Sequence, residues 1–321
     1  PPVATQSRRV ELPRPEPPPA PAPSEHPLIA KLAEWTDAVW QGRPTTSPAD
    51  ERATAAEQLA RREFARAERT YDRLLVENPS DVDLLLGKAA ALVGLSRYED
   101  ALVLLDRAVE LAPDRPDVLF NRGVVQTRLA QSEGAVASFK KCLSVAPDNI
   151  RARYNLAALY AAMGRHDEAL PLWRELTESA DAAGSPDLSR DALIEAWRGR
   201  GMAALEAYLG FEAIRAFERV VELAPRDVRG WLQLGIARAE SGRRAAAIEA
   251  LETALAIEPT FVPAINQLAY VHALIYRDTT SAEAREHVVR LCDRSLGIVA
   301  HQPRIQELRD TIHRLAREET Q

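Results

Sequence analysis

The sequence is poor in cysteine, in aromatic residues and in long hydrophobic runs. Cys142 and Cys292 are the two cysteines among 321 residues, so there is no CxxC pair, zinc-ligand spacing or disulfide framework, and both are expected to be small core residues. No stretch reaches the roughly 18 apolar residues of a membrane-spanning helix. The formal net charge of −6 and the lack of a basic stripe indicate that nucleic acid is not a partner.

Sequence motifs for catalysis are missing as well. The chain has no Gly-rich phosphate loop, GxSxG or HExxH, and its histidines, such as His166, His287 and His313, have no metal-ligand companions at helical spacing. The acidic residues alternate with arginines, as in DRAVE and ERVVE, which is typical of a solvated helix face. We therefore expect no enzyme, no metal and no cofactor.

Prolines, by contrast, recur at a fixed interval. Pro79, Pro113 and Pro147 are evenly spaced, Pro225 and Pro259 repeat the same interval, and the longer gap between the two sets holds two periods and ten extra residues. Each proline ends an apolar helical stretch, as in RAVELAPDRPDV, because proline cannot extend a helix and restricts the residue before it. The residue after the proline is often a good helix cap. The predicted caps are Ser80, Asp114, Asp148 and Thr260.

Small residues recur with the same period, at two places in each repeat. One set lies early in a predicted first helix: Ala89, Gly123, Ala157, Gly201, Gly235 and Ala269. The other lies early in the second helix: Ala67, Ala101, Ala135, Ala169, Ala213 and Ala247. Small side chains at matched positions let two helix axes approach to about 8–10 Å. Each period is therefore predicted to be one helical hairpin.

This pattern resembles the tetratricopeptide repeat (TPR), a 34-residue helical hairpin with a W-x-x-L-G signature, and the interval between the prolines equals the length of that repeat. Trp231, Leu234 and Gly235 match the signature, and NLAALYAAMGRHDEAL matches a second repeat, while Ser96 and Arg62 replace the usual turn glycine. The resemblance covers roughly residues 48–300. It implies an all-α fold, a right-handed superhelical solenoid of antiparallel helix hairpins.

The repeat predicts about seven hairpins within residues 48–300. They are expected to start near residues 48, 82, 116, 150, 194, 228 and 262. The insertion DAAGSPDLSR at 181–190 separates the first four hairpins from the last three. We interpret it as a structural joint, with a lip beside a binding groove as the alternative. Residues 301–321 are predicted to form a capping helix, because four apolar residues share one helical stripe. They are Ile305, Leu308, Ile312 and Leu315.

The N-terminal residues differ in composition. Ten of the 22 prolines lie within residues 1–27, which predicts an extended proline-rich linker that packs on nothing, with a PxxP ligand as the alternative. Residues 28–47 are predicted to hold a helix and a connector. That helix either caps the first repeat or is a detachable arm, since Leu28, Leu32, Trp35 and Val39 share one face.

The TPR resemblance also implies a binding groove lined by the first helices of the hairpins. The residues expected to face a bound partner are Phe120, Asn121, Arg151, Tyr154, Asn155, Arg198, Gln233, Asn266 and Gln267. A primary amide donates and accepts hydrogen bonds, so these amides could pair with the backbone of an extended peptide; alternatively they are ordinary solvated residues. In either case we expect Asn121 and Asn155 to be exposed, so that replacing them costs little stability.

We interpret the sequence as a bacterial TPR scaffold or adaptor that binds a peptide or protein partner in its groove. We expect it to be tethered through its N-terminus to a membrane or larger protein on the periplasmic or cell-envelope side, with the cytoplasm as the alternative. The sequence leaves open an assembly subunit that uses its outer face, or a repeat appendage of a larger enzyme. It does not predict the oligomeric state.

Overall fold

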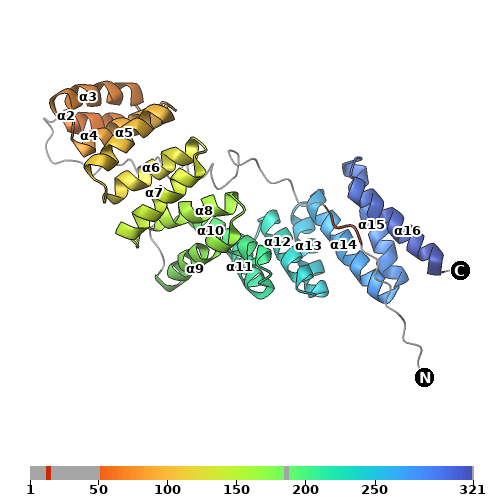
Figure 1. Cartoon of the computed structure of the whole chain (residues 1–321). Helices are drawn as coiled ribbons and strands as arrows, with labels where there is room; N and C mark the ends of the chain where they lie inside the picture. The colour runs from red at the N-terminus through yellow and green to blue at the C-terminus, as the bar shows by residue number, and fades with distance from the viewer. Residues whose placement is uncertain (1–11, 16–50, 184–187, 320–321) are drawn as a thin grey trace. The chain divides into compact units, whose positions relative to one another are not determined.

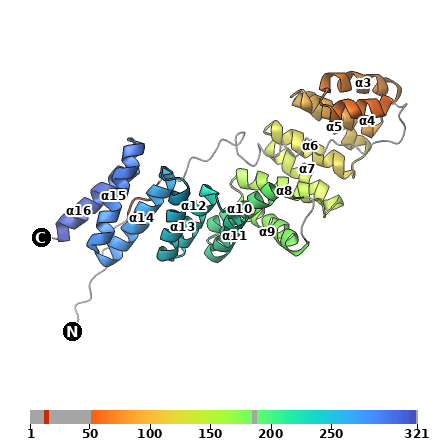
Figure 2. The ribbon, with the colours of Figure 1, turned by 180° about the vertical axis from the view of Figure 1, so that it is seen from behind.

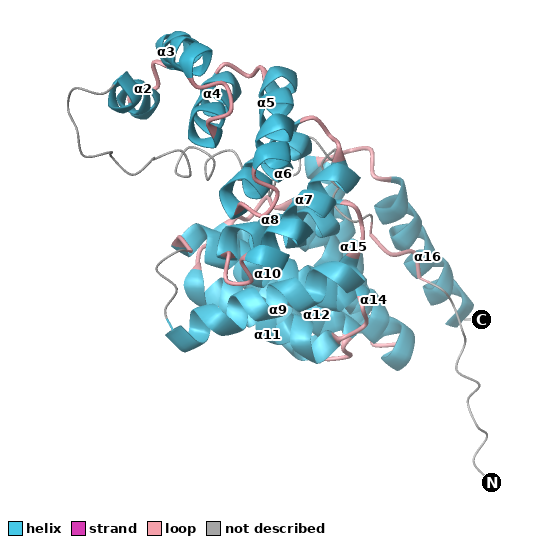
Figure 3. Cartoon of the chain, turned by 60° about the vertical axis from the view of Figure 1, so that its left-hand side comes forward, coloured by secondary structure: helices cyan, strands magenta, loops and turns pink. Residues whose placement is uncertain are grey.

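The described part of the chain is entirely helical. The computed structural model describes residues 12–15, 51–183 and 188–319, and among these it contains fifteen helices and no strand (Figure 3). The chain divides into two compact units. We call residues 51–183 with 188–189 the N-terminal unit, and residues 12–15 with 190–319 the C-terminal unit.

The N-terminal unit consists of four consecutive helix hairpins (Figure 1). The pairs are α2 (Glu51–Ala60) with α3 (Phe64–Glu77), α4 (Val82–Gly94) with α5 (Tyr98–Leu111), α6 (Pro116–Arg128) with α7 (Ser132–Val145), and α8 (Ile150–Ala162) with α9 (His166–Ala183). Within each pair the two helices pack on one another, and each hairpin packs on the next. Residues 184–187, in the middle of the predicted insertion, lie outside the described residues.

The C-terminal unit contains three hairpins and one further helix (Figure 1). The pairs are α10 (Arg190–Glu206) with α11 (Gly210–Leu223), α12 (Val228–Glu240) with α13 (Arg244–Ile257), and α14 (Val262–Thr279) with α15 (Ala282–Ile298). The last helix, α16 (Pro303–Glu319), packs on α15 and α14. It buries the four residues of its predicted apolar stripe. The prediction of an all-α array of helix hairpins is confirmed.

The repeated prolines do end helices, but the caps were predicted one residue too early. The amide of Asp81 donates to the carbonyl of Asn78, and that of Asn149 to the carbonyl of Ala146, so four residues form a β-turn between hairpins. Proline occupies the second turn position, which suits its fixed φ, and the residue after it still belongs to the turn. The cap is the next residue. Asp81, Asn149 and Asp227 accept backbone N–H bonds with their side chains.

The turn inside every hairpin contains one residue with positive φ. Glycine occupies this position at Gly164 and Gly242, where its missing Cβ removes the steric penalty of the left-handed region. Elsewhere the position is taken by residues that have a side chain. These are Arg62, Ser96, Ala130, Tyr208 and Thr280, with φ between 53° and 60°. The turn geometry is therefore fixed by the repeat rather than by glycine.

The small residues lie where the two helices of a hairpin cross, as predicted. A Cβ on Gly201 would lie 2.7 Å from the Phe217 ring, and one on Gly235 would lie 2.7 Å from Leu251. Phe217 and Leu251 are fully buried. The large residue four positions after each second-helix alanine therefore fills the space that the small first-helix residue leaves open.

Both cysteines are core residues, as predicted. Cys142 and Cys292 are fully buried free thiols. Burial raises the pKa of Cys142 to about 11 and that of Cys292 to about 12. At neutral pH neither forms the thiolate needed for nucleophilic or redox chemistry.

One part of the proline-rich linker contradicts its prediction. The linker was predicted to pack on nothing, yet Leu12 is 8% exposed and belongs to the hydrophobic cluster of the C-terminal unit. Residues 12–15 therefore pack as part of that unit, because a single leucine among prolines is enough to anchor a short extended segment. The other linker residues, and the predicted helix within 28–47, lie outside the described residues.

Candidate peptide-binding faces

The nine predicted groove residues all lie on first helices. Phe120 and Asn121 belong to α6, and Arg151, Tyr154 and Asn155 to α8, all within the N-terminal unit. The remaining four belong to the C-terminal unit. They are Arg198 on α10, Gln233 on α12, and Asn266 and Gln267 on α14.

The two predicted aromatic contact residues are core residues. Phe120 is 4% exposed and lies 6.0 Å from the ring centroid of Phe139 on α7. Tyr154 is 2% exposed and meets the Trp173 ring of α9 edge-on, with 5.3 Å between centroids. Their rings fill the interiors of the α6–α7 and α8–α9 hairpins. They are not available to a partner.

The expected exposure of the two asparagines is also wrong. Asn121 and Asn155 are 5% and 2% exposed, because the closely packed neighbouring helices leave little solvent around the middle of α6 and α8. Among the described residues, the Oδ1 atom of Asn155 has no hydrogen-bond partner. A buried carbonyl oxygen without a partner costs about 1–3 kcal/mol. Tyr160 Oη and Trp173 Nε1 of the α8–α9 hairpin are likewise buried without a partner among the described residues. Arg151, one turn earlier on α8, is half-buried.

A polar network that joins α5, α6 and α7 escaped the sequence analysis. Arg122 on α6 donates to Asp106 on α5 (Nε–Oδ1, 2.6 Å) and to Ser138 on α7 (Nη1–Oγ, 3.1 Å). Ser138 in turn donates to Gln126 Oε1 at 2.6 Å. These bonds fix α6 between α5 and α7. Ser138 and Gln126 belong to no motif, so the sequence contained no signal for them.

In the C-terminal unit the structure brings two predicted residues together. Arg198 donates from Nη1 to Gln233 Oε1 at 2.8 Å and pairs through Nη2 with Asp227 at 2.5 Å. Gln233 also donates to the sulfur of Met202, 3.4 Å away. Both groups of the Gln233 amide are therefore engaged within the protein. Asp227 is at the same time the N-cap of α12, so this cluster joins consecutive hairpins.

The Asn266 amide is also engaged. Ser295 on α15 donates to Asn266 Oδ1 at 2.5 Å, and Asn266 Nδ2 donates to Gln302 Oε1 at 2.8 Å. Gln302 closes the network by donating to Ser295 Oγ at 2.9 Å. This network fastens the start of α16 to the last hairpin. Gln267 is half-buried. A continuous ladder of available amides is thus not present in this unit, whereas Asn155 in the other unit has an unpaired oxygen.

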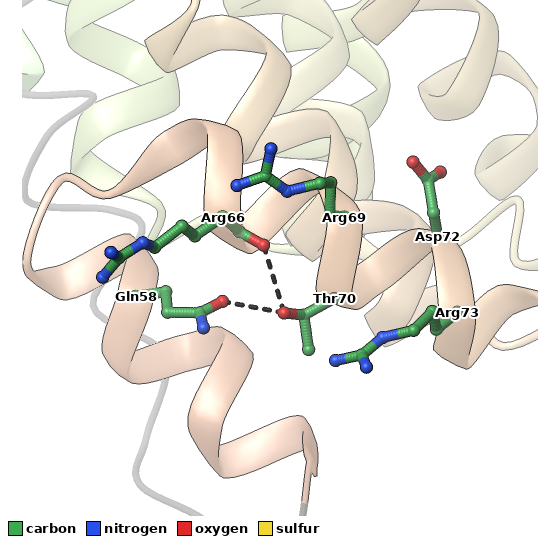
Figure 4. Close-up of a pocket in the computed structure, with 6 residues that line it drawn as sticks. All are labelled: Gln58, Arg66, Arg69, Thr70, Asp72 and Arg73. Atoms are coloured by element: carbon green, nitrogen blue, oxygen red, sulfur yellow. Dashed lines mark hydrogen bonds between the residues drawn. The ribbon is translucent and has the colours of Figure 1, made fainter.

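A separate hollow lies on the first hairpin, between α2 and α3 (Figure 4). Its volume is about 530 Å³. Gln58 of α2 and five residues of α3 line it: Arg66, Arg69, Thr70, Asp72 and Arg73. Thr70 donates to Gln58 Oε1 at 2.9 Å across its floor. The lining contains three arginines and one aspartate. Arg66 is paired with Glu63 at 2.8 Å, and Asp72 with Lys88 at 2.6 Å.

The described residues offer no arrangement for metal chemistry or for membrane insertion. Within residues 12–15, 51–183 and 188–319 no three His, Cys, Asp or Glu side chains come together as metal ligands. In the same ranges no helix combines the length and hydropathy needed to span a bilayer.

Comparison with known proteins defines the family of this repeat array. One tetratricopeptide repeat model matches residues 52–116 and 212–260, and a second matches residues 130–184, together more than half of the chain. The chain belongs to the tetratricopeptide repeat family. Repeats of this family generally mediate binding to proteins or peptides and are generally non-catalytic. No curated protein matches the sequence.

Solved structures show the same fold at low sequence identity. The C-terminal part of a TPR-containing protein from Cytophaga hutchinsonii is 14% identical with a TM-score of 0.61, over 81% of this chain and 99% of that one. YrrB, described as a TPR protein with an unusual peptide-binding site, is 23% identical with a TM-score of 0.54, over 61% and 95%. Pseudomonas aeruginosa pilF is 15% identical with a TM-score of 0.51, over 72% and 97%.

Proposed function

We propose that this chain is a non-enzymatic TPR adaptor that binds an extended peptide or protein segment on the first-helix face of its N-terminal unit. The observation that supports the proposal is the buried Asn155 amide, whose Oδ1 lacks a hydrogen-bond partner among the described residues. That oxygen is enclosed as the structure stands, so a bound segment would satisfy it with a backbone N–H once the Asn155 side chain turns outward. The fold of YrrB, whose description names a peptide-binding site, is consistent with this use of the array.

The geometry of the array favours an extended ligand. Asn121 occupies the same position on α6 that Asn155 occupies on α8, the first helix of the next hairpin. First helices of adjacent hairpins are spaced by about 10 Å, and three residues of an extended chain span the same distance at about 3.3 Å each. Once turned outward, the two amides would meet every third residue of a partner. They would read its backbone rather than its side chains.

A binding assay with a matched control tests this proposal. A phage-displayed random dodecapeptide library selects ligands, which are then titrated by fluorescence anisotropy against wild type, Asn155→Ala and Asn149→Ala. Asn155→Ala should weaken binding by about 1–3 kcal/mol, roughly ten- to a hundredfold, because a partner N–H is left unpaired. Asn149→Ala removes an amide of the same helix that already caps it, so affinity should stay within about twofold. Equal affinity for all three proteins would contradict the role of Asn155.

The tethering of the chain is a further part of the proposal. It is supported by the composition of residues 1–27, in which prolines are concentrated. We propose a location on the periplasmic or envelope side of a bacterial membrane, with the cytoplasm as the alternative. Fractionation of cells that express the full-length gene tests it, and recovery with the cytosol contradicts it. The sequence upstream of Pro1 would also show whether the array is an appendage of a larger enzyme.

A second candidate function is an assembly subunit that uses its outer face. Val76 on α3 and Val103 on α5 are 81% and 68% exposed, and both lie on second helices of adjacent hairpins. The arginine-lined hollow lies on the first hairpin, which also contains Val76 (Figure 4). Exposed apolar residues together with arginine are common in interfaces. Light-scattering mass measurement of wild type and Val76→Ser with Val103→Ser tests this. A concentration-dependent assembly that the double variant loses would favour it.

A further inference from the structure

Residues 12–15 show how an extended segment lies on this array. In Figures 1 and 2 this short segment runs along α14. Leu12 is buried in the cluster that α12 to α16 form. Pro13 and Pro15 are half-buried, and the Arg14 side chain is exposed. The leucine is therefore the anchor, and the Arg14 side chain contributes little to the contact.

The polar contact of this segment involves its backbone. Arg304, at the start of α16, donates from Nη1 to the main-chain oxygen of Arg14 at 3.4 Å, a long hydrogen bond. A guanidinium that binds a peptide carbonyl does not select a side chain. The segment thus contacts α14 and α16, which are successive first helices at the end of the array. This is the kind of face on which the family is expected to hold a partner.

The composition of the segment suits a ligand. Each proline fixes its own φ at a value compatible with polyproline helix, so Leu-Pro-Arg-Pro is already close to an extended conformation before it docks. Little conformational entropy is then lost on binding, and the burial of one leucine suffices to hold the segment. The recognised pattern is therefore Leu-Pro-x-Pro, in which x is any residue and contributes its main-chain carbonyl oxygen.

We propose that Leu12–Pro15 is an internal ligand that masks a second peptide-binding site, on α14 and α16 of the C-terminal unit. The site takes extended segments with a Leu-Pro-x-Pro pattern, and a partner must displace the internal segment to bind. The site lies in a different unit from Asn155, so its test does not depend on the outcome at Asn155.

The test uses the full chain and a fluorescein-labelled peptide with the sequence of residues 8–19, RRVELPRPEPPP. Leu12→Asp should release the internal segment, since it places a charge in an apolar cluster. If the segment occupies the site in nine molecules of ten, the apparent affinity of the wild type is reduced tenfold. We therefore expect the peptide to bind the Leu12→Asp chain at least about tenfold more tightly than the wild type. Arg14→Ala is the matched control and should behave as the wild type.

Two further measurements keep the outcome unambiguous. A peptide in which leucine is replaced by aspartate should not bind, and Arg304→Ala combined with Leu12→Asp should weaken binding of the original peptide about threefold or more. Equal affinity of wild type and Leu12→Asp, including no binding to either, would overturn the proposal. If the affinity ratio of Leu12→Asp to wild type rises with protein concentration, the segment comes from a second copy of the chain. That result would overturn the proposal of an internal ligand. Melting curves check that every variant is folded.

Discussion

Asn155 allows a sharp test because it and Asn149, the N-cap of α8, should respond to alanine substitution in opposite directions. Asn155→Ala removes a buried oxygen without a partner among the described residues, which relieves about 1–3 kcal/mol. Alanine also has a higher helix propensity than asparagine, by about 0.5 kcal/mol. The small cavity left behind costs about 1 kcal/mol. We expect a net stabilisation of about 0.5–2.5 kcal/mol, and a rise in Tm of roughly 2–8 °C for a unit of this size.

Asn149 is the control for this prediction. Its Oδ1 caps α8 by accepting from the Ala152 N–H at 2.9 Å, so Asn149→Ala should destabilise by about 1 kcal/mol. Because repeat arrays can melt locally, hydrogen exchange of α8 should accompany circular dichroism. If Asn155→Ala lowers the protection of α8 as Asn149→Ala does, then Asn155 Oδ1 is hydrogen-bonded in solution and the reasoning is refuted.

Three further predictions concern packing, turns and pH. Gly201→Ala should destabilise the C-terminal unit by about 1–3 kcal/mol in chemical unfolding, since its Cβ meets a buried ring, whereas Gly297→Ala meets nothing and should be neutral or stabilising. Ala130→Gly should increase the free energy of unfolding by up to about 1 kcal/mol and so raise Tm slightly, because alanine there has a φ of 55°. A decrease in Tm would refute this. Burial, and then the charge of His287 stacked 4.7 Å away, lower the pKa of His272 below 6.5. The unfolded state then binds more protons, so hydrogen-exchange protection of α14 and α15 should fall as the pH drops below about 6.5; a rise would contradict it.

The sequence predicted those features that depend on local, repeated chemistry. Evenly spaced prolines indicated the hairpins, and paired small residues such as Gly235 with Ala247 indicated where helices cross. The helix caps were misplaced because the residue after proline is part of a four-residue turn. Sequence position alone could therefore not locate Asp81 as the cap.

The candidate sites were harder to predict because they depend on distant partners. The Asn266 amide is engaged by Ser295 and Gln302, which lie 29 and 36 residues away and belong to no motif. The burial of Asn155 depends on how closely neighbouring hairpins pack, which periodicity does not reveal. Leu12 stands alone among prolines, so no hydrophobic pattern indicated that it packs.

The docked N-terminal segment has a consequence for the order of folding. Almost every other contact in the array joins helices that follow one another along the chain, so each hairpin can form soon after it is synthesised. The bond between Arg304 and Arg14 joins residues 290 positions apart. Its site on α14 and α16 does not exist until the last helix has been made. Docking of residues 12–15 therefore has to follow the synthesis of α16, and until then the leucine of this segment is open to chaperones and other proteins.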